Sequence, residues 1–216
     1  MRLGTVSKCA LAIALVALAV ALMGGTAAAD PWRAGNSRNP GYGVKASIST
    51  PSSMPSVPYG VVFNRVSNQD GMDWIQVGWV QGDGTVVAPD GTPWPTVPYS
   101  YEEARVDGYY DLYLFSSQPL NYVRTYEVVH TGSGTWQGIV ASTPRYSFGP
   151  FATPAIVEAV TEIRVSTQAH TRAGFSSAQY KGLYSYMAFD QNNRRQDYPP
   201  YATFNSNSNY TCYNGM

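Results

Sequence analysis

The sequence contains very little cysteine. Only two cysteines occur in 216 residues, and Cys9 lies in an N-terminal segment that we expect to be removed, so Cys212 alone stays in the mature chain. One cysteine cannot form an internal disulfide, and its place in a polar C-terminal segment does not favour a catalytic thiol. Packing must therefore stabilise the fold, which a chain of about 185 residues can achieve as one domain.

An excess of charge is also missing. The chain has 14 basic and 14 acidic residues, and removing Arg2 and Lys8 with the N-terminal segment leaves 12 basic against 14 acidic. No basic field for nucleic acid remains. We therefore expect no nucleic-acid partner.

The one long hydrophobic run, at residues 9–23, is too short for a membrane anchor. It has about 15 residues, whereas a spanning helix needs roughly 20. Arg2 and Lys8 precede the run, and three alanines at 27–29 offer small residues for cleavage. We interpret residues 1–29 as a secretory signal peptide and expect a secreted protein without a membrane partner.

No segment shows a sustained helical period. The mature chain is rich in Tyr, Gly, Pro, Ser, Thr and Val and poor in Lys, Glu and Leu, which is typical of β-proteins with many turns. Residues 30–58 lack periodicity and are predicted to be an extended arm or linker. For residues 59–216 we predict an all-β domain, an antiparallel β-sandwich of the jelly-roll or concanavalin type whose curved sheet forms a groove.

Turn-forming residues divide the predicted strands into pairs. Three hairpins are expected: 59–66 with 73–81, 99–106 with 109–115, and 122–130 with 135–142. The longest alternating run is 155–168, with small and apolar residues on one face and Glu158 and Glu162 on the other. A last long strand is expected at 180–189, followed by a polar tail at 190–216.

The strand predicted at 73–81 places one amide among large apolar side chains. Side chains two residues apart share a face, so two sets result: Ile75, Val77 and Trp79 on one face, and Trp74, Gln76, Gly78 and Val80 on the other. The first face is ordinary core. The second fits either a half-exposed sheet surface or the floor of a binding groove.

The usual catalytic systems find little support. The two histidines, His130 and His170, have no ligand-spaced partner, and no Gly-x-Ser-x-Gly motif occurs. We predict no metal and no cofactor. Glu158 and Glu162 lie about 13 Å apart along a strand, so either would need a partner on a neighbouring strand, for which Gln76 is the natural candidate. A Gln and a Glu on the solvated face of a sheet are commonplace, and the residues alone favour that interpretation.

A resemblance to a known family rests on the run Trp-Ile-Gln-Val-Gly-Trp-Val at 74–80, followed by Gly82 and Asp83. The segment Val-Glu-Ala-Val-Thr-Glu-Ile at 157–163 resembles that family's second conserved segment. Further matches follow in the same order: Thr167-Gln168, Gly174-Phe175, 181–186, Pro199-Pro200 and Cys212-Tyr213. Most of 59–215 thus resembles the neprosin family.

The resemblance implies a secreted glutamic endopeptidase that acts at acidic pH. Gln76 and Glu162 match the two catalytic positions, and a Gln with a Glu is also the pair of the fungal glutamic peptidases. Glu162 would act as general base and then general acid, and Gln76 would orient the water and stabilise the oxyanion. Glu158 is the alternative base, because strand register is hard to predict.

We expect Trp74, Tyr109, Tyr113 and Trp136 to line the groove and hold an extended peptide. Arg164 would lower the pKa of Glu162 if the two side chains approach. The expected partner is a peptide or protein substrate, bound by a monomer. The main alternative is a non-catalytic secreted β-sandwich whose aromatic face binds carbohydrate or a cell-wall polymer.

Overall fold

The computed structural model describes residues 32–53, 61–70, 72–151, 153–163, 170–196 and 200–214. The predicted signal peptide, residues 1–29, lies outside these residues, and so does Arg164. Within the described ranges no helix is long and apolar enough to cross a membrane.

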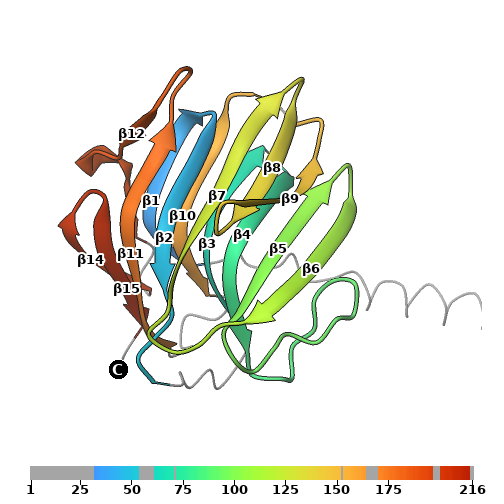
Figure 1. The fold of residues 1–216 in the computed structure, drawn as a ribbon, viewed down its shortest axis with the longest axis vertical. Helices are drawn as coiled ribbons and strands as arrows, with labels where there is room; N and C mark the ends of the chain where they lie inside the picture. The colour runs from blue at the N-terminus through green and yellow to red at the C-terminus, as the bar shows by residue number, and fades with distance from the viewer. Residues whose placement is uncertain are drawn as a thin grey trace, which may run out of the picture. The chain divides into compact units, whose positions relative to one another are not determined.

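Strands dominate these residues and form two antiparallel sheets. The first sheet runs in the order β13 (Arg194–Gln196), β1 (Trp32–Gly41), β10 (Ala155–Ile163), β3 (Val61–Asp70), β4 (Asp73–Gly82), β5 (Tyr99–Val106) and β6 (Tyr109–Ser117). The second runs β14 (Tyr201–Ser206), β15 (Asn209–Asn214), β11 (His170–Lys181), β2 (Gly43–Ser49), β7 (Val123–Gly132), β8 (Thr135–Val140) and β9 (Thr143–Phe148). Beside this path β12 (Tyr186–Ala188) pairs with β11, and one 3-10 turn, η1, covers Gln191–Asn193. The predicted all-β sandwich is confirmed (Figure 1).

The core lies between the two sheets. Ile75, Val77 and Trp79 on the inner face of β4 are almost completely buried and belong to one cluster with Ile48 and Tyr126 of the second sheet. Large apolar side chains on alternate positions leave water together when the two faces pack. The predicted core face of β4 is therefore confirmed, as are the three predicted hairpins, β3–β4, β5–β6 and β7–β8.

The outer face of the first sheet carries a second, smaller cluster at one end. Phe63, Val80 and Tyr101 project from β3, β4 and β5, and the loop between β4 and β5 adds Ala88 and Trp94. The rings of Phe63 and Trp94 meet edge to face, with centroids 5.1 Å apart. This loop closes one end of the outer face, so the polar groups described below occupy a neighbouring part of it.

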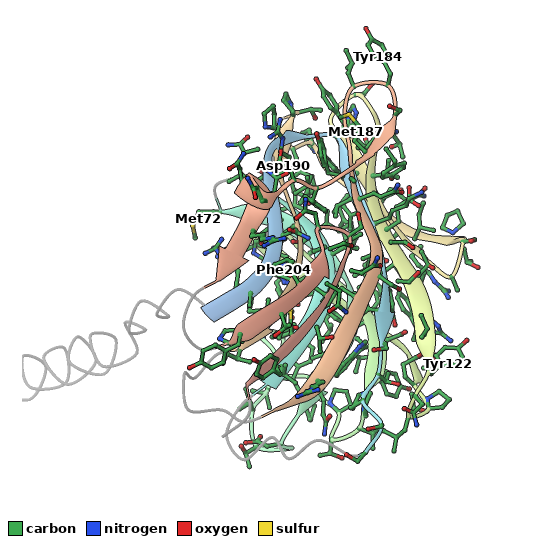
Figure 2. The ribbon with its side chains drawn as sticks, turned by 90° about the vertical axis from the view of Figure 1, so that its left-hand side faces the viewer. Met72, Tyr122, Tyr184, Met187, Asp190 and Phe204 are labelled. Carbon is green, nitrogen blue, oxygen red and sulfur yellow. The ribbon has the colours of Figure 1, made fainter. Side chains whose placement is uncertain are left out.

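Three sequence predictions need correction. Residues 32–49, assigned to an arm outside the domain, form β1 and β2, one strand in each sheet. The single strand expected at 180–189 is the β11–β12 hairpin, and Tyr184 stands exposed near its tip (Figure 2). The polar tail at 190–216 contributes η1 and three strands. β1, β2, β13 and β15 gain their structure from pairing with strands far away in the sequence, whereas β12 and β14 belong to local hairpins.

The only cysteine of the described residues is buried. Cys212 on β15 has no exposed surface, and its Sγ donates to the backbone oxygen of Ala34 at 3.3 Å. Burial raises the pKa of this thiol to about 12. Cys212 is therefore a packed thiol that links the two sheets.

Candidate active site

A row of four polar residues crosses the outer face of the first sheet. Gln76 on β4 pairs with Glu103 on β5 and, on its other side, with Ser67 on β3, which in turn pairs with Glu158 on β10. Residues directly opposite each other in antiparallel strands project to the same face. These four residues, the polar row, have exposed fractions of 5, 1, 2 and 0 % in the order named. Such burial of polar groups requires hydrogen-bond partners.

Gln76 finds its partner on the side of β5. Its Nε2 donates to Oε2 of Glu103, and the hydroxyl of Tyr110 on β6 donates to Oε1 of the same carboxylate at 2.5 Å. Tyr110 is held in turn by an edge-on contact with Trp74, with ring centroids 6.2 Å apart. Burial first, and then the nearby charge of Glu103, raise the pKa of Tyr110, so its hydroxyl keeps its proton.

Glu158 lies at the other end of the polar row, among arginines. Three guanidinium groups, the arginine cluster, surround it: Arg33 from β1, Arg65 from β3 and Arg195 from β13. Oε2 of Glu158 lies 3.1 Å from Nη1 of Arg33 and 3.5 Å from Nη2 of Arg65, and Oε1 lies 3.0 Å from Nη1 of Arg195. Arg65 also donates to the hydroxyl of Ser67. Positive charge thus compensates the buried carboxylate.

Glu162 shares two of these arginines. Its Oε2 lies 2.6 Å from Nη2 of Arg65 and 3.1 Å from Nε of Arg33. Glu158 and Glu162 therefore turn their carboxylates toward the same two guanidinium groups, although their Cα atoms lie about 13 Å apart along β10. Sequence reasoning considered these two residues too distant to act together, and the arginines bring their charges into one network.

The register separates the two carboxylates with respect to Gln76. Glu158 lies in the row of Gln76, two strands away, at about 10 Å between Cα atoms. Ser67 lies between them, and the guanidinium of Arg65 contacts both Ser67 and Glu158. Glu162 lies in the row of Val80, four residues or about 13 Å farther along the strands. The structure therefore places Gln76 opposite Glu158, the alternative base, rather than Glu162.

Of the four aromatic residues expected to line the groove, one lies on the face of Gln76. Trp74 shares that face and contacts Tyr110. Tyr113 pairs with Glu102 and therefore lies on the face of the sheet opposite to Gln76. Tyr109, four residues earlier on β6, lies on the same face as Tyr113 and is 79 % exposed. Trp136 has no exposed surface and packs in the core between the sheets. The expectation that Tyr109, Tyr113 and Trp136 line the groove is corrected, because strand alternation directs them away from it.

A second carboxylate of β5 points into the sandwich. Oε2 of Glu102 accepts a hydrogen bond from the backbone N–H of Tyr146 on β9 at 3.0 Å, and Gly138 on β8 makes room for the carboxyl group, because a Cβ there would clash with Oε1. Burial raises the pKa of Glu102 to about 7, opposed by backbone hydrogen bonds from Tyr146 and Gly138 and by the charge of Arg145.

Sequence reasoning missed Glu103 and the arginine cluster. The pair Glu102-Glu103 was visible within a predicted strand, and alternation alone assigns one glutamate to each face. Arg33 was missed because its segment was assigned to a linker. Arg195 was missed because its segment was assigned to a tail.

Comparisons with known proteins identify the fold. No protein-family model matches the chain, and no curated protein shows significant similarity in sequence. Among solved structures, scytalido-glutamic peptidase with a peptide-based transition-state analogue superposes with a TM-score of 0.58 and 11 % identity, over 85 % of this chain and 98 % of that chain. SCP-B, a member of the eqolisin family of peptidases in complex with the tripeptide Ala-Ile-His, gives a TM-score of 0.53 and 12 % identity over the same shares. The chain therefore has the sandwich fold of glutamic peptidases.

Proposed function

We propose that this protein is a secreted glutamic endopeptidase that hydrolyses peptide bonds at acidic pH, with Gln76 and Glu158 as its working pair. The observation that carries the proposal is the position of Gln76 opposite Glu158 across Ser67. The fold shared with glutamic peptidases supports it. So does the resemblance of 74–80 and 157–163 to the neprosin family, and the signal-peptide pattern supports secretion.

The pair supplies the two functions that peptide hydrolysis requires. A water bound between Gln76 and Glu158 gives a proton to the carboxylate of Glu158 as its oxygen attacks the scissile carbonyl carbon, and Glu158 then passes that proton to the leaving amine. Gln76 orients the water and donates an N–H to the developing oxyanion. One such donor contributes about 10²–10³ in rate.

Access to Glu158 requires a movement at the edge of the sheet. Glu158 has no exposed surface, whereas the side chain of Arg195 is 37 % exposed and that of Arg33 is 13 % exposed. Arg195 contacts Glu158 from the short strand β13, at the edge of the sheet. We propose that displacement of Arg195 uncovers Oε1 of Glu158, while Arg65 keeps its contacts with both carboxylates.

Acidic pH follows from the chemistry of a carboxyl group that both takes and returns a proton. General acid–base catalysis is most efficient near the pKa of the catalytic group, and a free Glu titrates at about 4.3. The test is digestion of a denatured protein by the purified chain between about pH 2 and 5. Inhibitors of serine, cysteine and metal-dependent peptidases should have no effect.

Two variants assign the base. Glu158→Gln should abolish cleavage, whereas Glu162→Gln, which changes a carboxylate in the same arginine network, should retain most of it if the variant folds. Full activity in Glu158→Gln would exclude Glu158 as the base. Binding of a cell-wall polymer by a wild-type protein that cleaves no peptide would favour the carbohydrate-binding alternative instead.

A further inference from the structure

We propose that Glu103 is a positioning residue that fixes the orientation of the Gln76 amide, and that Tyr110 holds Glu103 in place for this task. The proposal rests on the function proposed above, in which Gln76 orients water and stabilises an oxyanion. It assigns a role to a buried carboxylate that the hydrolytic steps do not use.

The contact with Glu103 makes the two ends of the Gln76 amide distinguishable. Both carboxyl oxygens of Glu103 accept hydrogen bonds, Oε1 from Tyr110 and Oε2 from Gln76, whereas a side-chain amide has one accepting and one donating end. With Nε2 toward Glu103, one N–H is bound and the other remains for a second acceptor. Rotating the amide by 180° would bring Oε1 against Oε2 of Glu103, so that two acceptors would face each other. Both residues are buried, so water cannot replace the lost bond cheaply.

Tyr110 restricts Glu103 in the same way. Its hydroxyl binds the carboxylate oxygen that Gln76 does not use, at a length typical of a charge-assisted O–H···O bond. Because its raised pKa keeps Tyr110 protonated, the hydroxyl remains a donor over the whole range in which the protein is expected to act. Tyr110, Glu103 and Gln76 thus form a chain across β6, β5 and β4.

The hydrogen bonds among Tyr110, Glu103 and Gln76 decide which groups of the Gln76 amide face the rest of the polar row. Glu103 takes one N–H of Gln76 on the side of β5, so the carbonyl oxygen and the second N–H are the groups available toward Ser67 and Glu158. The carbonyl oxygen can accept from the attacking water, and the second N–H can donate to the oxyanion. Loss of Glu103 would let the amide rotate, so that its carbonyl oxygen and its N–H groups could exchange positions.

Another Tyr–Glu hydrogen bond in this protein offers a matched control for Tyr110. On the second sheet, the hydroxyl of Tyr186 donates to Oε1 of Glu127, also at 2.5 Å. The pKa of Tyr186 is likewise raised, by burial and by the bond to Glu127. Tyr186→Phe therefore removes the same kind of Tyr–Glu hydrogen bond without touching Gln76.

The first experiment reads the amide directly and needs no activity. In ¹⁵N-labelled full-length protein, the side-chain NH₂ signals of Gln76 are assigned by their loss in Gln76→Glu. We expect Glu103→Gln and Tyr110→Phe to shift these signals and to increase their exchange with solvent at least tenfold, and Tyr186→Phe to leave them unchanged. Signals that stay unchanged in Tyr110→Phe and in any folded Glu103→Gln protein overturn the proposal.

The second experiment uses the kinetics of peptide cleavage. We expect Tyr110→Phe and Glu103→Gln to lower kcat by about tenfold or more with little change in KM, because substrate contacts remain while the oxyanion donor is misaligned. Tyr186→Phe should match wild type. Equal kcat in Tyr110→Phe and wild type contradicts the positioning role. A wild-type protein without peptidase activity contradicts the proposed function, and the amide signals then still decide whether Glu103 orients Gln76.

Discussion

Two consecutive glutamates on β5 have opposite surroundings, although both are buried. Glu103 faces outward and receives side-chain hydrogen bonds from Gln76 and Tyr110. Glu102 faces the interior, where the backbone N–H of Tyr146 donates to it and Arg145 contributes only a weaker charge effect. A shift of one residue along a strand thus moves a carboxylate from a polar network to an apolar core.

The difference shows what makes a buried carboxylate useful. On the outer face, side chains that donate hydrogen bonds give each carboxylate a defined position, and the neighbouring arginines balance the charge. In the interior, burial raises the pKa of Glu102 to about 7, so its neutral form is the one that the fold favours. The carboxylates on the outer face are therefore candidates for a catalytic or positioning role. Glu102 instead makes the stability of the fold depend on pH.

The largest effect on stability should come from Arg65→Met. This change leaves Glu158 and Glu162 with less positive charge while both remain buried, and removing one partner of a buried ion pair costs about 3–5 kcal/mol. Chemical denaturation near neutral pH measures it. Arg124→Met is the control, because Arg124 donates to the hydroxyl of Ser100 rather than to a carboxylate. Equal losses in the free energy of unfolding in the two variants would show that the ion pairs of Arg65 with Glu158 and Glu162 do not stabilise the fold through charge compensation.

Glu102→Gln should alter the pH dependence of stability. The folded protein holds the proton of Glu102 up to about pH 7, whereas the unfolded chain releases it near the ordinary pKa of a Glu, 4.5. The wild type therefore loses stability as pH rises from 4.5 to 7, by about 3 kcal/mol in all. Glu102→Gln should lack this loss and exceed the wild type by a similar amount at pH 8 relative to pH 4. Chemical denaturation at both pH values measures this. If the free energies of unfolding of Glu102→Gln and wild type differ by the same amount at pH 4 and at pH 8, this interpretation is wrong.

A smaller loss is expected for Gly138→Ala. The added Cβ would meet Oε1 of Glu102 and a methyl group of Val77 at 2.7 Å, and overpacking of this kind costs about 1–3 kcal/mol. Combining it with Glu102→Ala should recover part of the loss, because the carboxyl group that clashes is then absent. A double variant whose loss equals the sum of the two single losses would show that Gly138 does not serve to accommodate Glu102.

Local patterns predicted the parts of the fold that depend on neighbours in sequence. The hairpins followed from turn residues, and the core face of β4 followed from alternation. β1 was not predicted because its sequence is polar and contains glycine and proline, and its pairing with β10 is interrupted between Arg38 and Gly41. Such a strand is stabilised by a partner about 120 residues away, which no local pattern records.

The candidate site divides in the same way. Alternation placed Gln76, Glu158 and Glu162 on outward faces, as the register confirms. It could not choose between the two glutamates, because residues four apart on a strand share a face. The choice depends on how β10 aligns with β3 and β4, and that alignment is set by contacts between segments distant in sequence.

The most direct test of the central claim is a double-variant cycle for Gln76 and Glu158, measured as kcat/KM on one peptide at acidic pH. If the two residues act as a unit, Gln76→Ala lowers the value by about 10²–10³, Glu158→Gln lowers it further, and the double variant is no worse than Glu158→Gln alone. The same cycle with Glu162→Gln in place of Glu158→Gln should give independent, additive effects. Additive losses for Gln76 and Glu158, or coupling of Gln76 to Glu162 instead, would contradict the account.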